Sequence, residues 1–411
     1  MNAGSFRKRR ILLAPFGQHT RYVLRNYLVH TFVVLQALLC IALTIDLLPQ
    51  VEDVLSSASG LNSRDRAVRL LWFTILRSAD LMPAFIPLAI FLGVLWSEVA
   101  HTVSRERVLV WNSGRSPLRC LIPVAFLAVL FGTAQFVFDA YLRPAAMDAQ
   151  VQQQLGSRGR ELSRGLSREA IWIAFGEDLV QARIAYASGP TMHDVTLYRL
   201  NADGRVREVD KARFAVPAST PGHWLLNDGS YWVMPPEGPP TPDQLLATQG
   251  LGVSATAFEQ RSIALAGNPL HLSLWGIGPE YLSPDVLRAL MRDVTIGDSR
   301  SLFIARLHFY YANSLMPGAM ALLAAALSLM LFAHRAPLYT QLATLPAGYG
   351  GHLAMKTFVL LGEHDFIHPV VAVWLTPIAL LIISALMLAG MERRRRKGGK
   401  FDWEAPGHYL S

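Results

Sequence analysis

The chain is poor in cysteine and lacks the short motifs that mark nucleotide binding or hydrolytic catalysis. Its two cysteines, Cys40 and Cys120, each fall inside an apolar run, so we expect no disulfide between them. No G-x-x-x-x-G-K-[ST] sequence occurs, so the chain is not expected to bind ATP through a Walker A loop. The G-x-S-x-G and H-E-x-x-H motifs of two common hydrolase classes are absent as well.

A cleaved leader is not expected either. The cluster Arg7–Arg10 is basic, but it is not followed directly by an apolar segment of about 7–15 residues with a small-residue cleavage site. We therefore interpret the first apolar run as a membrane anchor that stays in the protein.

Apolar residues make up 52% of the chain, and they are bunched into long runs. A run of about 20 such residues is long enough to cross a hydrocarbon core about 30 Å thick, and we count about six of them. Three lie on each side of a long polar middle, so the pattern predicts an α-helical polytopic membrane protein with a 3+3 layout. The runs cover approximately residues 28–48, 67–100, 118–141, 308–332, 342–361 and 370–391.

The polar middle has the pattern of a small all-β domain. Short strand-like segments, such as 171–175 and 179–186, alternate with turn signals. Asp203-Gly204 and Asp228-Gly229 each predict a hairpin turn. Residues 283–291 predict a short helix with a proline in its first turn. We therefore expect a β domain inserted between the two membrane halves.

Lysine and arginine in the short flanks of the runs predict the orientation. Residues 1–26 and 393–400 carry six each and residues 101–119 carry four, whereas 51–66 carry two and 362–369 none. Both termini are thus expected in the cytoplasm and the β domain outside it. The expected parts are a membrane half at 1–145 with a cytoplasmic helix at about 101–117, the β domain at 146–304, a membrane half at 305–392 and a basic tail at 393–411.

The polar stretch between the second and third runs is the first candidate site. Ser104 is suited to cap a short helix whose positive first turn would contain Glu106. Gly114 and Pro117 are suited to end it. Such a helix exposes the apolar residues 108–111, which need something to pack against. A soluble motor subunit is one candidate, and a tight turn lying in the lipid headgroups is the alternative.

Ionisable residues within the apolar runs are the second group of candidates, because such residues are costly in a bilayer. Asp46 lies near the far end of the first run, where it faces water, a cavity or the interface. Arg77 and Asp80 lie in the outer half of the second run. Lys356 either extends to the interface, pairs with an acid, or faces a cavity that receives an anion.

Glu363-His364-Asp365 and His368 resemble a metal-ligand cluster near the outer end of the fifth run. No third ligand at motif spacing follows, so a solvated loop is the alternative. Two rival functions follow from the residues alone. One is a membrane-anchored scaffold whose β domain binds envelope proteins, and the other is a membrane hydrolase that uses His364 and His368.

Several short motifs follow one another in a definite order: Arg21-Tyr22, Asp46-Leu47-Leu48, Pro83 with Pro87, Ser104-Arg105-Glu106, Val108-Leu109, Ser113-Gly114-Arg115-Ser116-Pro117, Trp224-Leu225-Leu226, and Pro369 with Trp374-Leu375-Thr376-Pro377. Their order and spacing resemble those of the LptF/LptG permeases, the membrane subunits of the lipopolysaccharide export transporter. The resemblance covers nearly the whole chain and includes the 3+3 layout.

The resemblance implies a transport subunit rather than an enzyme. ATP and Mg²⁺ would be bound by a separate cytoplasmic ATPase dimer, and this chain would hold no cofactor. The resemblance assigns ATPase coupling to the residues Ser104, Arg105, Glu106, Val108 and Leu109.

The same resemblance implies further partners and a location. It implies a paired homologous permease, a bitopic periplasmic partner and a soluble bridge protein, and no nucleic acid. Lipopolysaccharide or a related envelope lipid would leave the bacterial inner membrane through a periplasmic, jellyroll-like β domain.

The chain departs from the family pattern at two positions. Asp46 stands where some members carry a lysine that faces lipid phosphates, and Arg306 stands where an acidic residue is usual. An acid at position 46 would repel a phosphate, so a related amphipathic lipid, or cations supplied by the paired permease, must be considered. Asp46, Arg77 and Lys356 are the candidates for contact with the lipid.

Overall fold

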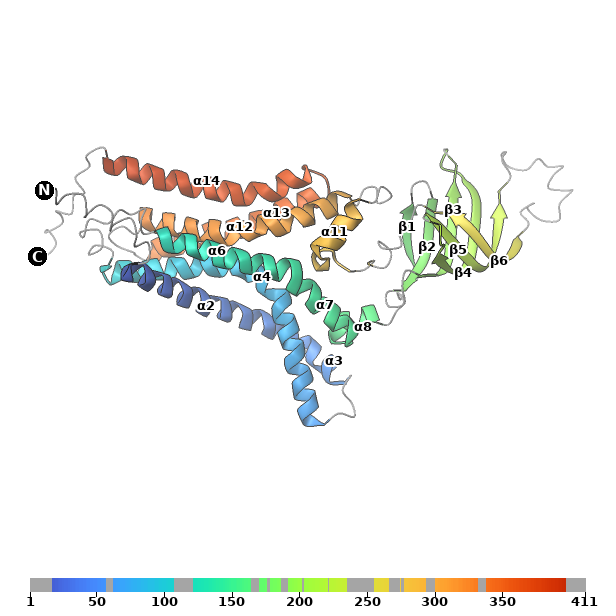
Figure 1. Cartoon of the computed structure of the whole chain (residues 1–411), viewed down its shortest axis with the longest axis horizontal. Coiled ribbons are helices and arrows are strands. Elements are labelled where there is room, and N and C mark those ends of the chain that lie inside the picture. The colour runs from blue at the N-terminus through green and yellow to red at the C-terminus, as the bar shows by residue number, and fades with distance from the viewer. Residues whose placement is uncertain are drawn as a thin grey trace, which may run out of the picture. The chain divides into compact units, whose positions relative to one another are not determined.

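The apolar runs form long helices in the computed structural model of the chain (Figure 1). Among the described residues, five helices are long and apolar enough to cross a membrane: Gln18–Gln50, Ser63–Val103, Ile122–Gln152, Arg300–Leu331 and Pro369–Arg393. The predicted class, a polytopic helical membrane protein with an inserted β domain, is confirmed. The structure describes residues 17–56, 62–106, 121–163, 170–175, 178–185, 191–201, 203–220, 222–234, 255–265, 274, 277–292, 300–331 and 338–396.

The chain divides into two units. A helical unit comprises residues 1–49, 74–143 and 304–411, and a second unit, which contains the β-sheet, comprises residues 50–73 and 144–303. The long helices are α2 (Gln18–Leu47), α4 (Ser63–Val103), α6 (Ile122–Val137), α12 (Arg300–Leu331), α13 (Leu338–Glu363) and α14 (Pro369–Arg396).

The sixth expected run is α13, which is helical but falls short of the five in apolarity. Its glycines, with His352 and Lys356, lower the mean hydropathy. The same glycines permit close packing in the helical unit. A methyl group on Gly351 would lie 3.2 Å from the Cδ1 atom of Leu380 on α14, and one on Gly348 would collide with Phe91 on α4.

The core of the helical unit lies among α2, α4, α6, α12, α13 and α14 and is filled by aliphatic, aromatic and methionine side chains. Its largest fully buried members include Tyr27, Ile86, Ile90, Phe91 and Leu127. Large apolar side chains also lie on the outer faces of the same helices, for example Phe32, Ile45 and Val129. A bundle that is apolar both inside and outside is what a lipid environment requires.

Prolines interrupt α4, which continues through both of them for 41 residues, or about 60 Å. Pro87 has no N–H, so the carbonyl of Pro83, four residues earlier, lacks its helical donor. The side chain of Gln135 on α6 replaces that donor, with its Nε2 atom 3.0 Å from the Pro83 oxygen. The break in α4 is therefore closed by a neighbouring helix.

The third apolar run, expected at about residues 118–141, continues as a helix beyond its predicted end, past Arg143 and Pro144. A π-helical turn, η3 (Phe138–Leu142), follows α6, and α7 (Arg143–Gln152) continues from it. In a π turn each carbonyl pairs with the N–H five residues on, as Phe138 does with Arg143. The helical path thus continues past Pro144 as far as Gln152.

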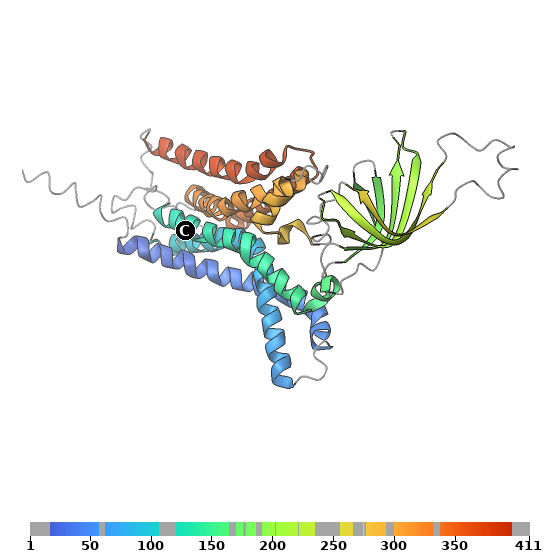
Figure 2. The same cartoon turned by 45° about the vertical axis from the view of Figure 1, so that its right-hand side comes forward.

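The sheet of the second unit has six antiparallel strands whose order in space is their order in sequence (Figures 1 and 2). Each strand pairs with the next one along the chain, which is the order of a meander. The strands are β1 (Ile171–Phe175), β2 (Asp178–Ala185), β3 (Thr191–Leu200), β4 (Val206–Pro217), β5 (His223–Val233) and β6 (Thr256–Ala264).

One of the two predicted hairpin turns is confirmed and the other is wrong. Gly204 has φ +73° in the turn between β3 and β4, where its N–H donates to Asn201. Asp228 and Gly229, in contrast, lie inside the continuous strand β5. Gly229 pairs with Ala212 on one side and Phe258 on the other, so β5 is held as a strand by two neighbours.

Short helices complete the second unit: α3 (Val51–Ser56), α8 (Gly156–Ser163), the single turn η4 (Pro279–Tyr281) and α11 (Pro284–Met291). The prediction of α11 is confirmed, including Pro284 in its first turn. Ser283 caps this helix and accepts a hydrogen bond from the N–H of Val286.

Candidate functional site: an ionic network and the end of α4

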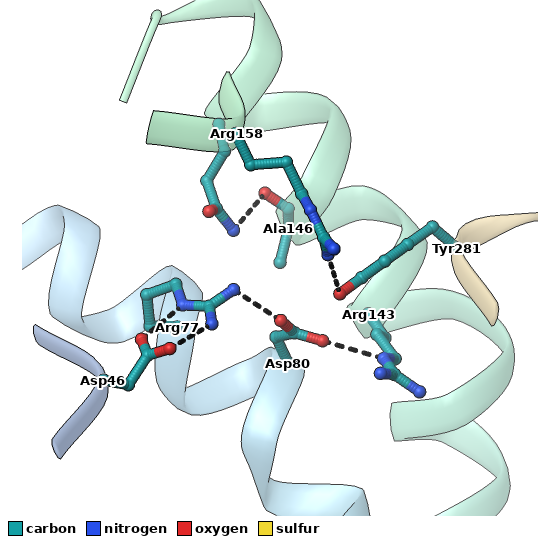
Figure 3. A network of polar contacts seen from close by, with 8 residues as sticks. Asp46, Arg77, Asp80, Arg143, Ala146, Arg158 and Tyr281 are labelled. Carbon is teal, nitrogen blue, oxygen red and sulfur yellow. Dashed lines mark hydrogen bonds and ion pairs between the residues drawn. The ribbon is translucent and has the colours of Figure 1, made fainter. Parts of the chain in front are cut away.

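Four charged side chains form a continuous network in the helical unit (Figure 3). Arg77 lies at its centre and binds Asp46 with two nitrogens, at 2.7 and 2.6 Å. The third nitrogen of Arg77 lies 2.6 Å from Asp80, one turn further along α4. The other oxygen of Asp80 accepts from Arg143 at 2.8 Å. We call Asp46, Arg77, Asp80 and Arg143 the helical quartet.

The helical quartet joins the end of α2, the middle of α4 and the start of α7. Asp80 is 5% exposed and Asp46 is 22% exposed. Two carboxylates and two guanidinium groups balance in charge, and the fork of Arg77 on Asp46 is the strong, bidentate form of ion pair. Asp46 is thus the counterion of Arg77 and does not present an uncompensated negative charge. That Asp46 and Arg77 contact lipid stays a prediction.

A separate contact in the second unit is drawn in the same figure. Arg158 on α8 donates to the hydroxyl of Tyr281 at 2.8 Å, and its guanidinium lies 5.4 Å from the centre of that ring (Figure 3). Tyr281 also packs against Met147 and Leu162. These contacts fix η4 against α7 and α8.

Three of the five predicted coupling residues, Ser104, Arg105 and Glu106, directly follow the end of α4. The hydroxyl of Ser104 donates back to the carbonyl of His101 at 3.3 Å. Arg105 has φ +60°, a left-handed conformation that ends the helix. Val108 and Leu109 lie outside the described residues. The role of these five residues in coupling therefore stays a prediction.

Glu106 is held by side chains of α2 and α4. The hydroxyl of Tyr22 donates to its Oε1 atom at 3.2 Å, and the Nε2 atom of His101 lies 3.8 Å from its Oε2 atom. Asn26 contacts the same nitrogen of His101 at 3.1 Å. The carboxylate that begins the predicted coupling segment is thus fixed to two helices.

A second acid of α4, one helical turn before His101, also accepts a hydrogen bond from a tyrosine of α2. The hydroxyl of Tyr27 on α2 donates to Glu98 on α4. Ser328 on α12 donates to the other oxygen of Glu98 at 3.5 Å. Glu98 and Ser328 are buried. Glu98 was not among the sequence-predicted site residues, although an acid near the end of an apolar run could have indicated a functional position.

A second buried acid was missed as well. Asp139 lies on η3 and accepts hydrogen bonds from Gln135 on α6 and Asn313 on α12, both at 2.7 Å. All three side chains are buried. Asp139 falls inside the third apolar run, so its charge alone could have identified it. Its partner Asn313 is 174 residues away and could not have been identified from the sequence.

The remaining candidates are found apart from the helical quartet. Arg306 on α12 forms an ion pair with Glu363 at the end of α13, 2.5 Å long. The arginine that departs from the family pattern is therefore matched by an acid of this chain.

Lys356 lies exposed on α13 and forms no hydrogen bond or ion pair within the described part of the chain. Its contact with lipid stays a prediction.

His364 and His368 lie exposed in the turn between α13 and α14. Within the ranges that the structure describes, no group of three or more histidine, cysteine, aspartate or glutamate residues is placed to hold a metal ion.

Comparison with models of known protein families matches nearly the whole chain. The family described as "Lipopolysaccharide export system permease LptF/LptG" matches residues 21–389, which is nearly the whole chain. The match includes the helical quartet, the end of α4 and the sheet. No curated protein matches the chain.

Proposed function

Because the chain belongs to the LptF/LptG family of lipopolysaccharide export permeases, we propose that it is the permease subunit of an ATP-driven ABC exporter. As a membrane transport component of that family, it would extract lipopolysaccharide, or a related envelope lipid, from the inner membrane. It would then pass the lipid to a periplasmic bridge. The observation that carries this proposal is the family match together with a carboxylate, Glu106, anchored to two core helices.

Extraction of such a lipid needs an external energy source. Moving acyl chains into water costs roughly 0.8 kcal/mol per CH₂ group. A multi-acyl lipid therefore cannot leave the bilayer by thermal motion. In the proposed exporter the ATPase dimer, with its own ATP and Mg²⁺, docks at the end of α4. A force on Glu106 would reach α2 and α4 through Tyr22 and His101.

The proposed topology follows the arginine and lysine distribution, with both termini cytoplasmic and the sheet in the periplasm. The proposed partners are a homologous permease, a bitopic periplasmic subunit and a soluble bridge protein. Asp46, Arg77 and Lys356 are proposed to lie along the lipid path. The exposed ammonium group of Lys356 supports this, because it is available to an anionic headgroup.

The test is a charge reversal at Glu106 in the complex purified from its native membrane. We expect Glu106→Lys to abolish recovery of the ATPase with the permease, and to abolish ATP-dependent release of lipid from proteoliposomes. Glu259→Lys is the matched control, because Glu259 is exposed on β6 in the second unit. A membrane scaffold would tolerate the Glu106 change. Normal ATPase recovery and lipid release in Glu106→Lys, with the thermal unfolding unchanged, would contradict the proposal.

A further inference from the structure

We infer that Asp139 binds a proton in the folded protein, in a site completed by Gln135 and Asn313. The three residues come from η3, α6 and α12 of the helical unit. The inference does not depend on the lipid that is transported or on the ATPase.

Among the described residues, the two amide donors to the acid reach the same one of its two oxygens. Both amide nitrogens, of Gln135 and of Asn313, lie 2.7 Å from the Oδ2 atom of Asp139. Gln135 directs its second N–H to the carbonyl of Pro83. The Asp139 residue is 2% exposed.

The amide oxygen of Gln135 lacks a donor. Gln135 is fully buried, and its Oε1 atom has no hydrogen-bond partner within the described part of the chain. A buried acceptor of this kind is costly. An ionised carboxylate can only accept, whereas a protonated one carries an O–H that donates. A protonated Asp139 would carry an O–H donor next to a side chain whose amide oxygen lacks one.

Charge balance leads to the same result. Arg143 and Arg306 are the cations that act electrostatically on Asp139. Arg143 is paired with Asp80 and Arg306 is paired with Glu363. Among the described residues Asp139 has no ion pair of its own. An ionised Asp139 would leave one uncompensated negative charge in the core, and a neutral one leaves none.

The other titratable groups on the surrounding helices are also engaged. On α4, Arg77 and Asp80 belong to the helical quartet (Figure 3). On α12, the ring of His308 lies 3.4 Å from the indole nitrogen of Trp374. Tyr141, on the same π turn as Asp139, is exposed.

The site lies where the α-helical hydrogen-bond pattern is interrupted in two neighbouring helices, so a change in its charge would affect how these helices pack. A π turn holds Asp139, and Gln135 closes the gap that Pro87 leaves in α4. Release of the proton to water would create a charge where α4, α6 and α12 meet. Proton occupancy is thereby linked to the packing of these three helices.

Infrared spectroscopy of the full chain in lipid nanodiscs at neutral pH tests the inference. Protein labelled with ¹³C in the aspartate carboxyl groups is compared with unlabelled protein. We expect a carbonyl band of a protonated carboxylic acid that shifts with the label and with deuterium. We expect the band to be absent in Asp139→Asn and present in Asp285→Asn, whose parent residue is exposed on α11. Absence of a label-sensitive band in the unsubstituted protein would overturn the inference.

A second variant covers the case in which Asp139→Asn does not fold. Gln135→Leu removes the proposed acceptor of the proton, so the labelled band should move to the higher frequency of a more weakly hydrogen-bonded acid. A band that is unchanged in Gln135→Leu, or that remains in a folded Asp139→Asn protein, would show that the proton lies elsewhere.

Discussion

The helical unit and the second unit each contain a cluster of two carboxylates and two arginines, but they hold these clusters differently. The helical quartet joins separate helices, which are not connected to one another by a backbone ladder. The cluster in the sheet joins strands that are already connected by backbone ladders. We call its members, Arg199, Glu208, Asp210 and Arg261, the sheet quartet.

The sheet quartet adds ion pairs to strands that backbone hydrogen bonds already hold in register. Arg199 on β3 faces Glu208 on the adjacent strand β4, 3.2 Å away. Arg261 on β6 reaches Glu208 and Asp210 across β5, where its guanidinium lies 4.0 Å from the centre of the Tyr231 ring. The ladders fix the strand register whether or not these ions pair. The comparison therefore indicates that ion pairs position elements in the helical unit and only reinforce them in the sheet.

Replacing Arg77 by alanine should have the largest effect, because it removes the central residue of the helical quartet. Asp46 loses its bidentate partner and Asp80 loses one of two. We expect a loss of about 3 kcal/mol of stability, near the low end for a broken buried pair because Asp46 is partly exposed. Thermal unfolding in detergent measures it. Arg64→Ala, at an exposed position of α4, is the control, and an equal effect of the two would refute the positioning role.

The matching change in the sheet is Arg261→Ala, with a smaller and local effect. We expect a loss of about 1–2 kcal/mol from broken charged hydrogen bonds, since the arginine is a quarter exposed and the ladders remain. Hydrogen exchange in the full chain should become faster in peptides that cover β4 and β6. Arg213→Ala, exposed on β4, is the control. Faster exchange in α2 or α4 would remove the contrast between the two units.

The stability of the sheet should also depend on pH, because one acid of the sheet quartet has a shifted pKa. Burial raises the pKa of Asp210, an effect that Arg261 and Arg199 oppose and Glu208 adds to. The folded sheet therefore binds this proton more tightly than the unfolded chain does. Its stabilising contribution is complete below about pH 3.9, the ordinary pKa of aspartate, and is lost as the pH rises through the folded pKa.

We expect Asp210→Asn to remove this decline in stability with rising pH. Hydrogen exchange of β4, corrected for intrinsic exchange rates, measures it at several pH values from about 4 upward. Glu259→Gln, at an exposed site on β6, should leave the decline in place. A decline of equal size in Asp210→Asn would assign it to another group.

The smallest effect is expected at the end of α4. Tyr22 is 45% exposed, so Tyr22→Phe removes a hydrogen bond that water can replace. We expect a stability loss of about 0.5 kcal/mol. Tyr27→Phe, whose hydroxyl donates to the buried Glu98, is the contrast and should cost about 1–3 kcal/mol. Thermal unfolding of both variants measures the difference, and equal losses would contradict it.

Local sequence signals predicted the elements that depend on neighbouring residues. Apolar runs became helices, 171–175 became β1, and Asp203-Gly204 formed its turn. Ser283 and Pro284 began α11. Each of these features is decided within a few residues by burial periodicity, turn conformation or capping.

Features decided by distant residues were missed. The pairing of Gly229 on both sides overrode the turn propensity of Asp228-Gly229. Asp46 meets Arg77 across 31 residues, so its charge was interpreted without its counterion. The π turn that carries Asp139 was not predicted, nor was the continuation of the helix past Arg143-Pro144.

The bond from Gln135 to the carbonyl of Pro83 has a mechanical consequence. A backbone group of α4 depends on a side chain of another helix, so a twist of α4 about its own axis at this point would leave a buried carbonyl unpaired. A movement of α4 at this position would therefore be coupled to a movement of α6.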